Sequence, residues 1–200
     1  LDRPTTTQRS PLLAVGAGGW AYETGTDEWV TDPALLEKLA PRAKDKELQA
    51  KWRAAKQERK ALCAKMVEET TGVKVSTDAM FDIQIKRIHE YKRQLLNIMG
   101  IIHRYNEMKA MTPEERANVT PRVCLFGGKA YATYLQAKRI VRLVTAVGEV
   151  VNNDPEIGDL LKVVFVPDYN VSLAETLIPA SELSQHISTA GMAASGPGNM

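Results

Sequence analysis

Apolar and polar side chains follow two different periods along the centre of the chain. Between Phe81 and Lys86 they alternate one by one, which is the period of a β-strand. From His89 to about Met111 the period becomes helical, and one face collects the side chains of Tyr91, Leu95, Ile98, Ile102 and Tyr105. The pattern therefore predicts a strand that is followed directly by a helix.

The same order of elements recurs twice further along the chain. Residues 123–126 form a short apolar strand that runs into two glycines, and an amphipathic helix is expected at about 131–151. Residues 163–166 are apolar on both faces, as expected of a buried parallel strand.

Shorter elements are predicted from their capping residues. Thr112–Glu115 has the spacing of a capping box and predicts a short helix. Ser172 and Glu175 have the same spacing, which predicts a further helix that ends near Pro179. A fourth short strand is expected at 185–188.

The spacing of the strands predicts the fold class. They begin at 81, 122 and 163, so that 41 residues separate each start from the next, with one helical pattern or slightly more in each gap. Strand, helix and strand in this order are typical of right-handed crossovers on a parallel sheet. We therefore expect an α/β fold with a Rossmann-like parallel sheet and flanking helices. Ligands of such sheets bind at the carboxyl ends of the strands.

The region before the first strand is predicted to be helical. Asp32 before Pro33 has the pattern of a helix start, and a long polar helix is expected at about 43–69, with Gly72 as its stop. Its narrow apolar stripe consists of Leu48, Trp52, Ala55, Leu62 and Met66.

Three segments are expected along the chain. Residues 1–24 are an unassigned leader, 25–78 a helical segment, and 79–200 an incomplete Rossmann-like βαβ part of a domain. The chain ends at Met200, directly after a glycine-rich turn of the kind that normally connects elements, which predicts a fragment cut inside a domain.

Composition excludes several classes of protein. The 200 residues carry a formal net charge of +2, which argues against a non-specific binder of nucleic acid. No apolar run is long enough to span a membrane. Cys63 and Cys124 lie far apart with no nearby histidine ligands, so neither a disulfide framework nor a metal site is expected, and a reducing compartment fits best.

A cluster of cations follows the first predicted strand. It consists of Lys86, Arg87, His89, Lys92 and Arg93. Helix N-termini carry positive partial charge, so cations placed there are unfavourable unless an anion binds among them. We expect a phosphate site, because arginine offers phosphate a bidentate fork and lysine a point charge. The alternative is a solvated charged face.

Two glycine-rich turns have a bearing on phosphate binding. The Gly127–Lys129 turn is not a Walker A loop, because Val123 stands where that loop has its first glycine and Ala130 where it has Ser or Thr. A close approach of the backbone at this strand end stays open. The Ser195–Gly198 turn is either a backbone site for phosphate or a plain connecting loop.

Four stretches of the sequence resemble the α-glucan phosphorylases, the starch and glycogen phosphorylases. Their residues are most similar to those of the plant and algal branch. They are Phe81–Asn97, Gly127–Ala130, Val166–Ser172 and Ser184–Met192. The resemblance implies part of the C-terminal domain of an enzyme with two Rossmann-like domains, the GT-B architecture. It also implies that the chain ends just before the lysine that binds pyridoxal phosphate covalently.

The resemblance further implies an activity and its ligands. The family transfers a terminal α-1,4-linked glucose of starch, glycogen or maltodextrin to inorganic phosphate, which gives glucose 1-phosphate. Pyridoxal 5'-phosphate is the cofactor, and its phosphate exchanges a proton with the substrate phosphate. A cytoplasmic or plastid homodimer that binds neither nucleic acid nor membrane is expected for the full-length protein, with no activity for this segment alone.

Individual roles follow where the sequence matches the family's motifs. Lys86 resembles the lysine near the cofactor phosphate, and Arg87 and Lys92 resemble the pair that holds the substrate phosphate. Tyr91 resembles a tyrosine near the sugar, and Tyr169 a residue beside the cofactor.

The final turn is expected to contact both glucose and the cofactor. Ser195 and Gly196 resemble backbone contacts to glucose, and Gly196 and Gly198 resemble the turn at the cofactor phosphate. Ala193 stands where the family has a glutamate that contacts glucose, and Pro197 where it has a threonine at the cofactor phosphate. Two alternatives stay open, a non-catalytic or degenerate sugar-phosphate-binding module, to which these departures give weight, and a nucleotide-sugar glycosyltransferase of GT-B fold.

Overall fold

The computed structural model describes residue 28 and residues 31–192. The chain divides between Lys60 and Ala61 into two compact units. The division predicted from the sequence, at residues 24/25 and 78/79, stays a prediction.

Two described helical elements begin in the first unit, and the second of them continues past Lys60. A 3₁₀-helix, η2 (Pro33–Arg42), begins at Asp32, whose carboxylate accepts a hydrogen bond from the Ala34 N–H. Helix α2 (Lys46–Thr71) starts three residues later than predicted, after Asp45, which accepts from the first free N–H groups of the helix. Gly72 has φ +73 and ends the helix, as expected.

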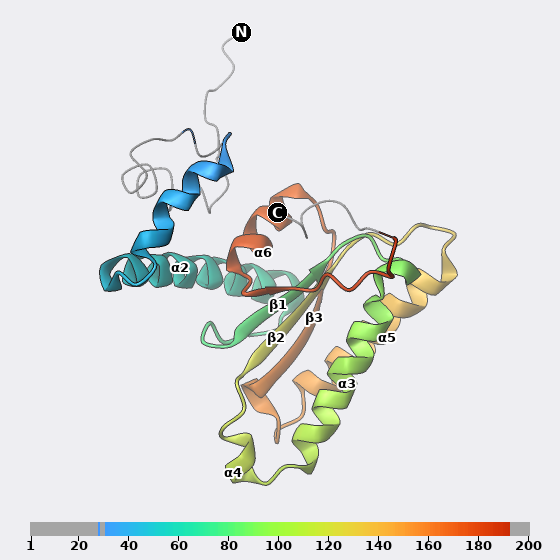
Figure 1. Ribbon diagram of the computed structural model, residues 1–200. Helices are drawn as coiled ribbons and strands as arrows, with labels where there is room; N and C mark the ends of the chain where they lie inside the picture. Colours follow the sequence, from blue (N-terminus) through green and yellow to red (C-terminus); the bar gives the residue numbers. More distant parts are fainter. Residues whose placement is uncertain (1–27, 29–30, 193–200) are drawn as a thin grey trace. The chain divides into compact units, whose positions relative to one another are not determined.

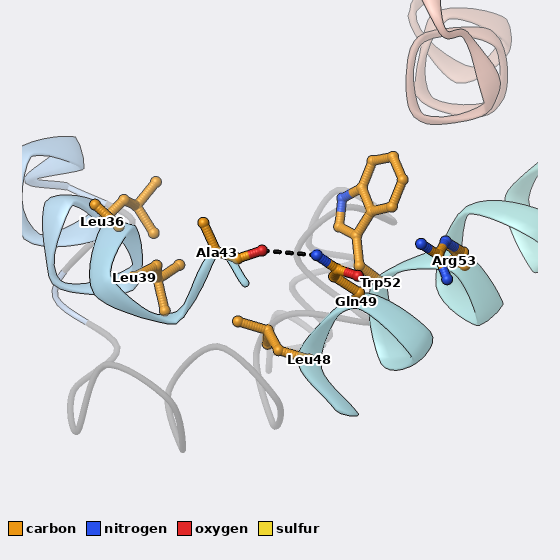
Figure 2. Close-up of a pocket in the computed structure, with 8 residues that line it drawn as sticks. Leu36, Leu39, Ala43, Leu48, Gln49, Trp52 and Arg53 are labelled. Atoms are coloured by element: carbon orange, nitrogen blue, oxygen red, sulfur yellow. Dashed lines mark hydrogen bonds between the residues drawn. The ribbon is translucent and has the colours of Figure 1, made fainter. Parts of the chain in front are cut away.

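The predicted apolar stripe of α2 is only partly right. Leu48 and Trp52 line a hollow of about 560 Å³ between η2 and the start of α2 (Figure 2). Leu62 is 47% exposed, whereas Cys63 and Val67 are completely buried against the sheet. The error arose because both faces of this helix carry apolar side chains, and the sequence does not say which face meets the sheet.

The second unit is built on a parallel sheet of four strands, as the spacing predicted. Its strands are β1 (Met80–Ile85), β2 (Arg122–Gly127), β3 (Leu161–Val166) and β4 (Leu183–Ser184). The spatial order is β3-β2-β1-β4, and every neighbouring pair is parallel.

Helices cover both faces of the sheet (Figure 1). Helices α3 (Gln94–Ala110) and α5 (Leu135–Asn152) pack with Cys124, Phe126 and Val163 on one face. Helix α6 (Val171–Ala180) and the second half of α2 pack on the other face. Each apolar layer holds one free cysteine, Cys63 or Cys124, and burial raises the pKa of both thiols to about 12.

The chain reverses its direction of travel across the sheet. From β1 it passes to β2 and then to β3, and α6 returns it to β4 on the far side of β1. The crossover to β2 and the crossover into β4 end on opposite sides of β1, so the topological switch point lies at the carboxyl ends of β1 and β4, the position where ligands of open α/β sheets bind.

The helix predicted from His89 begins later and buries a different face. Residues Glu90–Lys92 form a 3₁₀ turn, Arg93 takes the left-handed conformation with φ 58, and α3 starts at Gln94. Leu95, expected on the apolar face, is exposed, and the buried residues are Gln94, Ile98, Ile101 and Met108. The cationic cluster therefore lies in a loop before the helix and not in its first turn.

Other boundaries are corrected in the same way. Helix α5 begins at Leu135 and not near 131. The N-cap of α6 is Asn170, whose side chain accepts from the Leu173 N–H, so the capping box predicted at Ser172 is wrong. Strand β4 is two residues long and precedes the predicted 185–188. The capping box of Thr112 and Glu115 is confirmed at helix α4 (Pro113–Arg116).

Within the described residues, no helix combines the length and the apolar character needed to cross a membrane.

Two glycines inside helices provide a matched test of the packing. A Cβ on Gly148 of α5 would lie 2.6 Å from the Val163 carbonyl oxygen of β3, whereas a Cβ on Gly100 of α3 would meet no atom within 4 Å. We expect Gly148→Ala to lower the free energy of unfolding by about 1–3 kcal/mol through overpacking. Gly100→Ala raises it by about 0.5–1 kcal/mol, because alanine favours the helix. Urea unfolding followed by circular dichroism measures both, and equal effects would contradict the close approach of α5 to β3.

Candidate anion-binding site

A lysine joins the carboxyl ends of β1 and β4. Lys86 directly follows β1, and its ammonium donates to the Gln185 carbonyl at 3.0 Å, just after β4. Nδ1 of His186 lies 3.4 Å from the same ammonium. The predicted cofactor-phosphate lysine therefore lies at the position where the topology predicts a ligand.

The glycine turn after β2 sets the position of the Lys86 main chain. The Lys86 N–H donates to the Gly127 carbonyl at 2.8 Å. Gly128 has φ +157, and a Cβ there would lie only 1.9 Å from the Lys86 carbonyl oxygen. The sequence left open a close approach of the backbone at this turn. The structure shows that the turn after β2 approaches the main chain of Lys86 at the end of β1, and any side chain at Gly128 would force these two segments apart.

A buried carboxylate fixes the side chain of Gln185. Asp82 of β1 is 4% exposed, and both of its oxygens accept from the Gln185 side-chain amide at 2.9 Å. Arg122 of β2 donates to the same carboxylate at 3.1 Å. Burial raises the pKa of Asp82, and the bonds from Gln185 and Arg122 oppose that rise. Asp82 therefore fixes Gln185, and the Gln185 carbonyl accepts the hydrogen bond from the Lys86 ammonium.

The segment after β4 lies along the loop after β1. The Arg93 guanidinium donates to the carbonyls of Ile187 and Ser188. Thr189 donates its N–H to the Tyr91 carbonyl at 2.8 Å. Arg93 was expected to belong to the anion site, but its guanidinium joins these two segments instead.

Two buried side-chain amides bond the main chain of the loop after β1. Gln84 of β1 and Gln94 of α3 are 1% and 0% exposed, and each donates to a main-chain carbonyl of the loop, that of Lys92 and that of Arg87 respectively.

Aromatic rings support the outer side of the loop. The His89 ring lies with its centroid 4.5 Å from that of Tyr91 and 5.1 Å from that of Tyr134, and its Nδ1 accepts from the Tyr91 N–H. The Tyr134 hydroxyl donates to the Glu90 carboxylate at 2.5 Å, and this bond raises the pKa of Tyr134. His89 therefore orders the loop through its ring and its Nδ1.

Of the five predicted residues of the cationic cluster, Lys86, Arg87 and Lys92 remain as candidates to bind an anion. Burial and the nearby Lys92 charge both lower the pKa of Lys86. The Lys92 ammonium lies 5.6 Å from the centroid of the Tyr91 ring, and Arg87 is exposed. In the part of the chain that the structure describes, no carboxylate forms an ion pair with Lys86, Arg87 or Lys92. Like charges gathered without a counter-ion favour an anion among them.

The remaining predicted residues divide into two groups. Tyr169, directly beyond β3, packs beside Gly127, and a Cβ on that glycine would lie 3.3 Å from its ring. Burial raises the pKa of Tyr169. Ser195, Gly196 and Gly198 lie outside the described residues, as do the two departures from the family pattern, Ala193 and Pro197.

The sequence did not predict a role for four polar residues that are buried or held by side-chain hydrogen bonds. They are Asp82, Gln84, Gln94 and Gln185. For Asp82 and Gln84 the available signal was the alternation in β1, which was used only to predict a strand. In a parallel sheet both faces are covered, so polar residues at alternate positions are buried and need partners.

A parallel α/β sheet that carries cations beside its switch point is an arrangement typical of α/β proteins with anionic ligands. The family model described as carbohydrate phosphorylase matches residues 20–200, and the chain belongs to this family.

Curated relatives agree with the family. The chain is 65% identical over 178 residues to the alpha-1,4 glucan phosphorylase L-2 isozyme, chloroplastic/amyloplastic, of Solanum tuberosum. It is 63% identical to alpha-glucan phosphorylase 1 and 58% identical to the cytosolic alpha-glucan phosphorylase 2, both of Arabidopsis thaliana. Each match covers 88% of this chain, but the chain spans only 18–21% of the length of these relatives.

The charge of Lys86 can be titrated directly. Because its pKa lies below the ordinary 10.5, we expect its acylation by an amine reagent to rise with a pH midpoint below that value. Lys92→Met removes the neighbouring charge and moves the midpoint upward. Mass spectrometry of the labelled peptide measures both midpoints. A midpoint that does not move in Lys92→Met would contradict the coupling between the two ammonium groups.

Proposed function

We propose that the full-length protein carrying this segment transfers the terminal α-1,4-linked glucose of a glucan to inorganic phosphate. The glycosidic bond at C1 breaks, a phosphate oxygen bonds to C1, and the released glucan hydroxyl takes a proton, so the products are glucose 1-phosphate and a shortened glucan. Starch, glycogen and maltodextrin are the proposed substrates. The observation that carries the proposal is the group of cations in the loop after β1, which have no described counter-ion.

Arg87 and Lys92 are proposed to bind the substrate phosphate. The guanidinium of Arg87 is exposed and offers two parallel N–H donors to phosphate oxygens. The ammonium of Lys92 offers a point charge from the same loop. Charge that builds up on the phosphate during the transfer is stabilised by donors that are already in place, which costs no rearrangement when the bond breaks.

Lys86 fits a second phosphate, that of pyridoxal 5'-phosphate. Its ammonium is partly desolvated and repelled by Lys92, so a nearby dianion would restore its preference for the charged form. When bound, the cofactor supplies a phosphate that exchanges a proton with the substrate phosphate. Tyr169, Gly196 and Gly198 are proposed to hold the cofactor together with Lys86.

The sugar is proposed to bind beside the same loop. The Tyr91 ring lies near both the His89 ring and the Lys92 ammonium, and the Thr189 N–H donates to the Tyr91 carbonyl. Its phenol is proposed to contact glucose, with Ser195 and Gly196 as backbone partners. The proposed sugar contact thus belongs to the same loop as the two proposed phosphate cations.

Assembly and location are proposed with the function. The relatives include chloroplastic/amyloplastic and cytosolic isozymes, so either a plastid or the cytoplasm fits the full-length protein. The homodimer stays a prediction, which light scattering of the full-length protein tests.

Phosphorolysis by the full-length protein is the direct test. With maltoheptaose, inorganic phosphate and pyridoxal phosphate, we expect glucose 1-phosphate. Arg87→Met lowers kcat/KM for phosphate by about 10²–10³, which is typical of losing one donor to developing charge. Lys74→Met is the control, because its ammonium is exposed and lies 3.5 Å from Glu68 in a surface ion pair of little energetic weight.

Two results would count against the proposal. An Arg87→Met enzyme as active as the Lys74→Met control would remove Arg87 from the site. A full-length protein that binds phosphate but releases no glucose 1-phosphate would favour the non-catalytic sugar-phosphate-binding module, to which Ala193 and Pro197 already point.

A further inference from the structure

We infer that two buried glutamines, Gln84 and Gln94, are positioning residues for the phosphate cations Arg87 and Lys92. The inference rests on the proposed function. Neither glutamine contacts the ligand. Each acts by fixing the main chain of one of the two cations, so that both side chains start from set positions.

Gln84 fixes the end of the loop at Lys92. Its side chain leaves β1 on the face covered by α3, and its Nε2 donates to the Lys92 carbonyl at 3.1 Å. Its Oε1 accepts from the Asn97 side chain of α3 at 2.8 Å. Both the donor and the acceptor of the amide are therefore used, and Asn97 sets which way the amide points.

Gln94 fixes the start of the loop at Arg87. It is the first residue of α3 and is completely buried, and its Nε2 donates to the Arg87 carbonyl at 3.2 Å. Its Oε1 accepts from the His89 N–H at 3.3 Å. One side chain thus closes the loop back onto the helix that follows it.

Burial of these amides is explained by the loop and not by the core. An apolar side chain of equal size would fill the same space, but it would leave the main-chain carbonyls of Lys92 and Arg87 without these donors. The loop between β1 and α3 contains only one 3₁₀ turn of regular structure, and Arg93 breaks it from the helix. The side-chain amides of Gln84 and Gln94 therefore supply the hydrogen-bond donors that a sheet or helix would otherwise provide to the main-chain carbonyls of the loop.

The kinetic consequence is specific to phosphate. Arg87 and Lys92 lie five residues apart and have to reach one anion together, so release of either main-chain contact moves one cation relative to the other. A shift of about 1 Å in a positioned group costs up to about 100-fold in rate. We expect KM for phosphate to rise about 10- to 100-fold, while KM for the glucan changes little.

The test uses Gln84→Met and Gln94→Met in the full-length protein, since methionine keeps the volume and removes both hydrogen bonds. Asn152→Leu is the matched control. Its amide also bonds a main chain twice, at 2.8 Å to the N–H and to the carbonyl of Val163, but on β3 and away from the loop. Steady-state kinetics give KM for phosphate and for maltoheptaose, and hydrogen exchange measured by mass spectrometry reports on residues 86–93.

The expected result is a selective one. Both Met variants raise KM for phosphate and speed exchange in residues 86–93, while exchange in β2 stays slow. Asn152→Leu speeds exchange around Val163 and leaves KM for phosphate unchanged. If Gln84→Met does not fold, Asn97→Ala replaces it, because this change removes only the partner that orients Gln84 and should produce the same signature at smaller amplitude. If Gln94→Met does not fold, Gln94→Glu replaces it, because glutamate keeps an acceptor for the His89 N–H and loses the donor to the Arg87 carbonyl.

Other outcomes separate the two proposals. If KM for phosphate and KM for the glucan change equally, or if the Met variants match Asn152→Leu, the glutamines are structural only and the inference is overturned. If the unmodified protein makes no glucose 1-phosphate, the proposed function fails. In that case, inorganic phosphate that slows exchange in residues 86–93 of the unmodified protein but not of the Met variants would still support positioning of an anion site.

Discussion

The hydrogen bond from the Lys86 ammonium to the Gln185 carbonyl connects the ends of two strands that lie 99 residues apart in sequence. It exists only because the chain crosses back over the sheet and places β4 beside β1. Asp82 then fixes Gln185 from within the sheet, and Gly128 lets β2 approach the Lys86 main chain. Fold, glycine turn and buried carboxylate thus converge on the position of one ammonium group.

The architecture could be predicted from the sequence because it depends on local periodicity. The three long strands and the parallel sheet follow from alternation and spacing, which the chain shows plainly. The start of α3 could not be predicted, because helical periodicity continues through residues that the structure holds in a loop. Arg93 adopts the left-handed conformation while its guanidinium binds the distant carbonyls of Ile187 and Ser188. No local pattern records such a contact.

The cations of the site could likewise be found in the sequence, but not what supports them. Density of charge after a strand pointed to Lys86, Arg87 and Lys92, whereas Gln84 and Gln94 look like ordinary polar surface residues in a linear sequence. Their burial becomes visible only when both faces of the sheet are covered. A polar residue in a doubly covered parallel strand is therefore a useful signal, because burial obliges it to bind a particular partner.

The two cysteines report on which apolar layer separates from the sheet. Cys63 lies in the layer beneath α2 and α6, and Cys124 in the layer beneath α3 and α5. With a pKa of about 12, neither thiol supplies much thiolate, the form that alkylating reagents attack, at neutral pH. Iodoacetamide therefore modifies each cysteine only when its own layer separates. The order in which the two are alkylated tells which side of the sheet comes apart first.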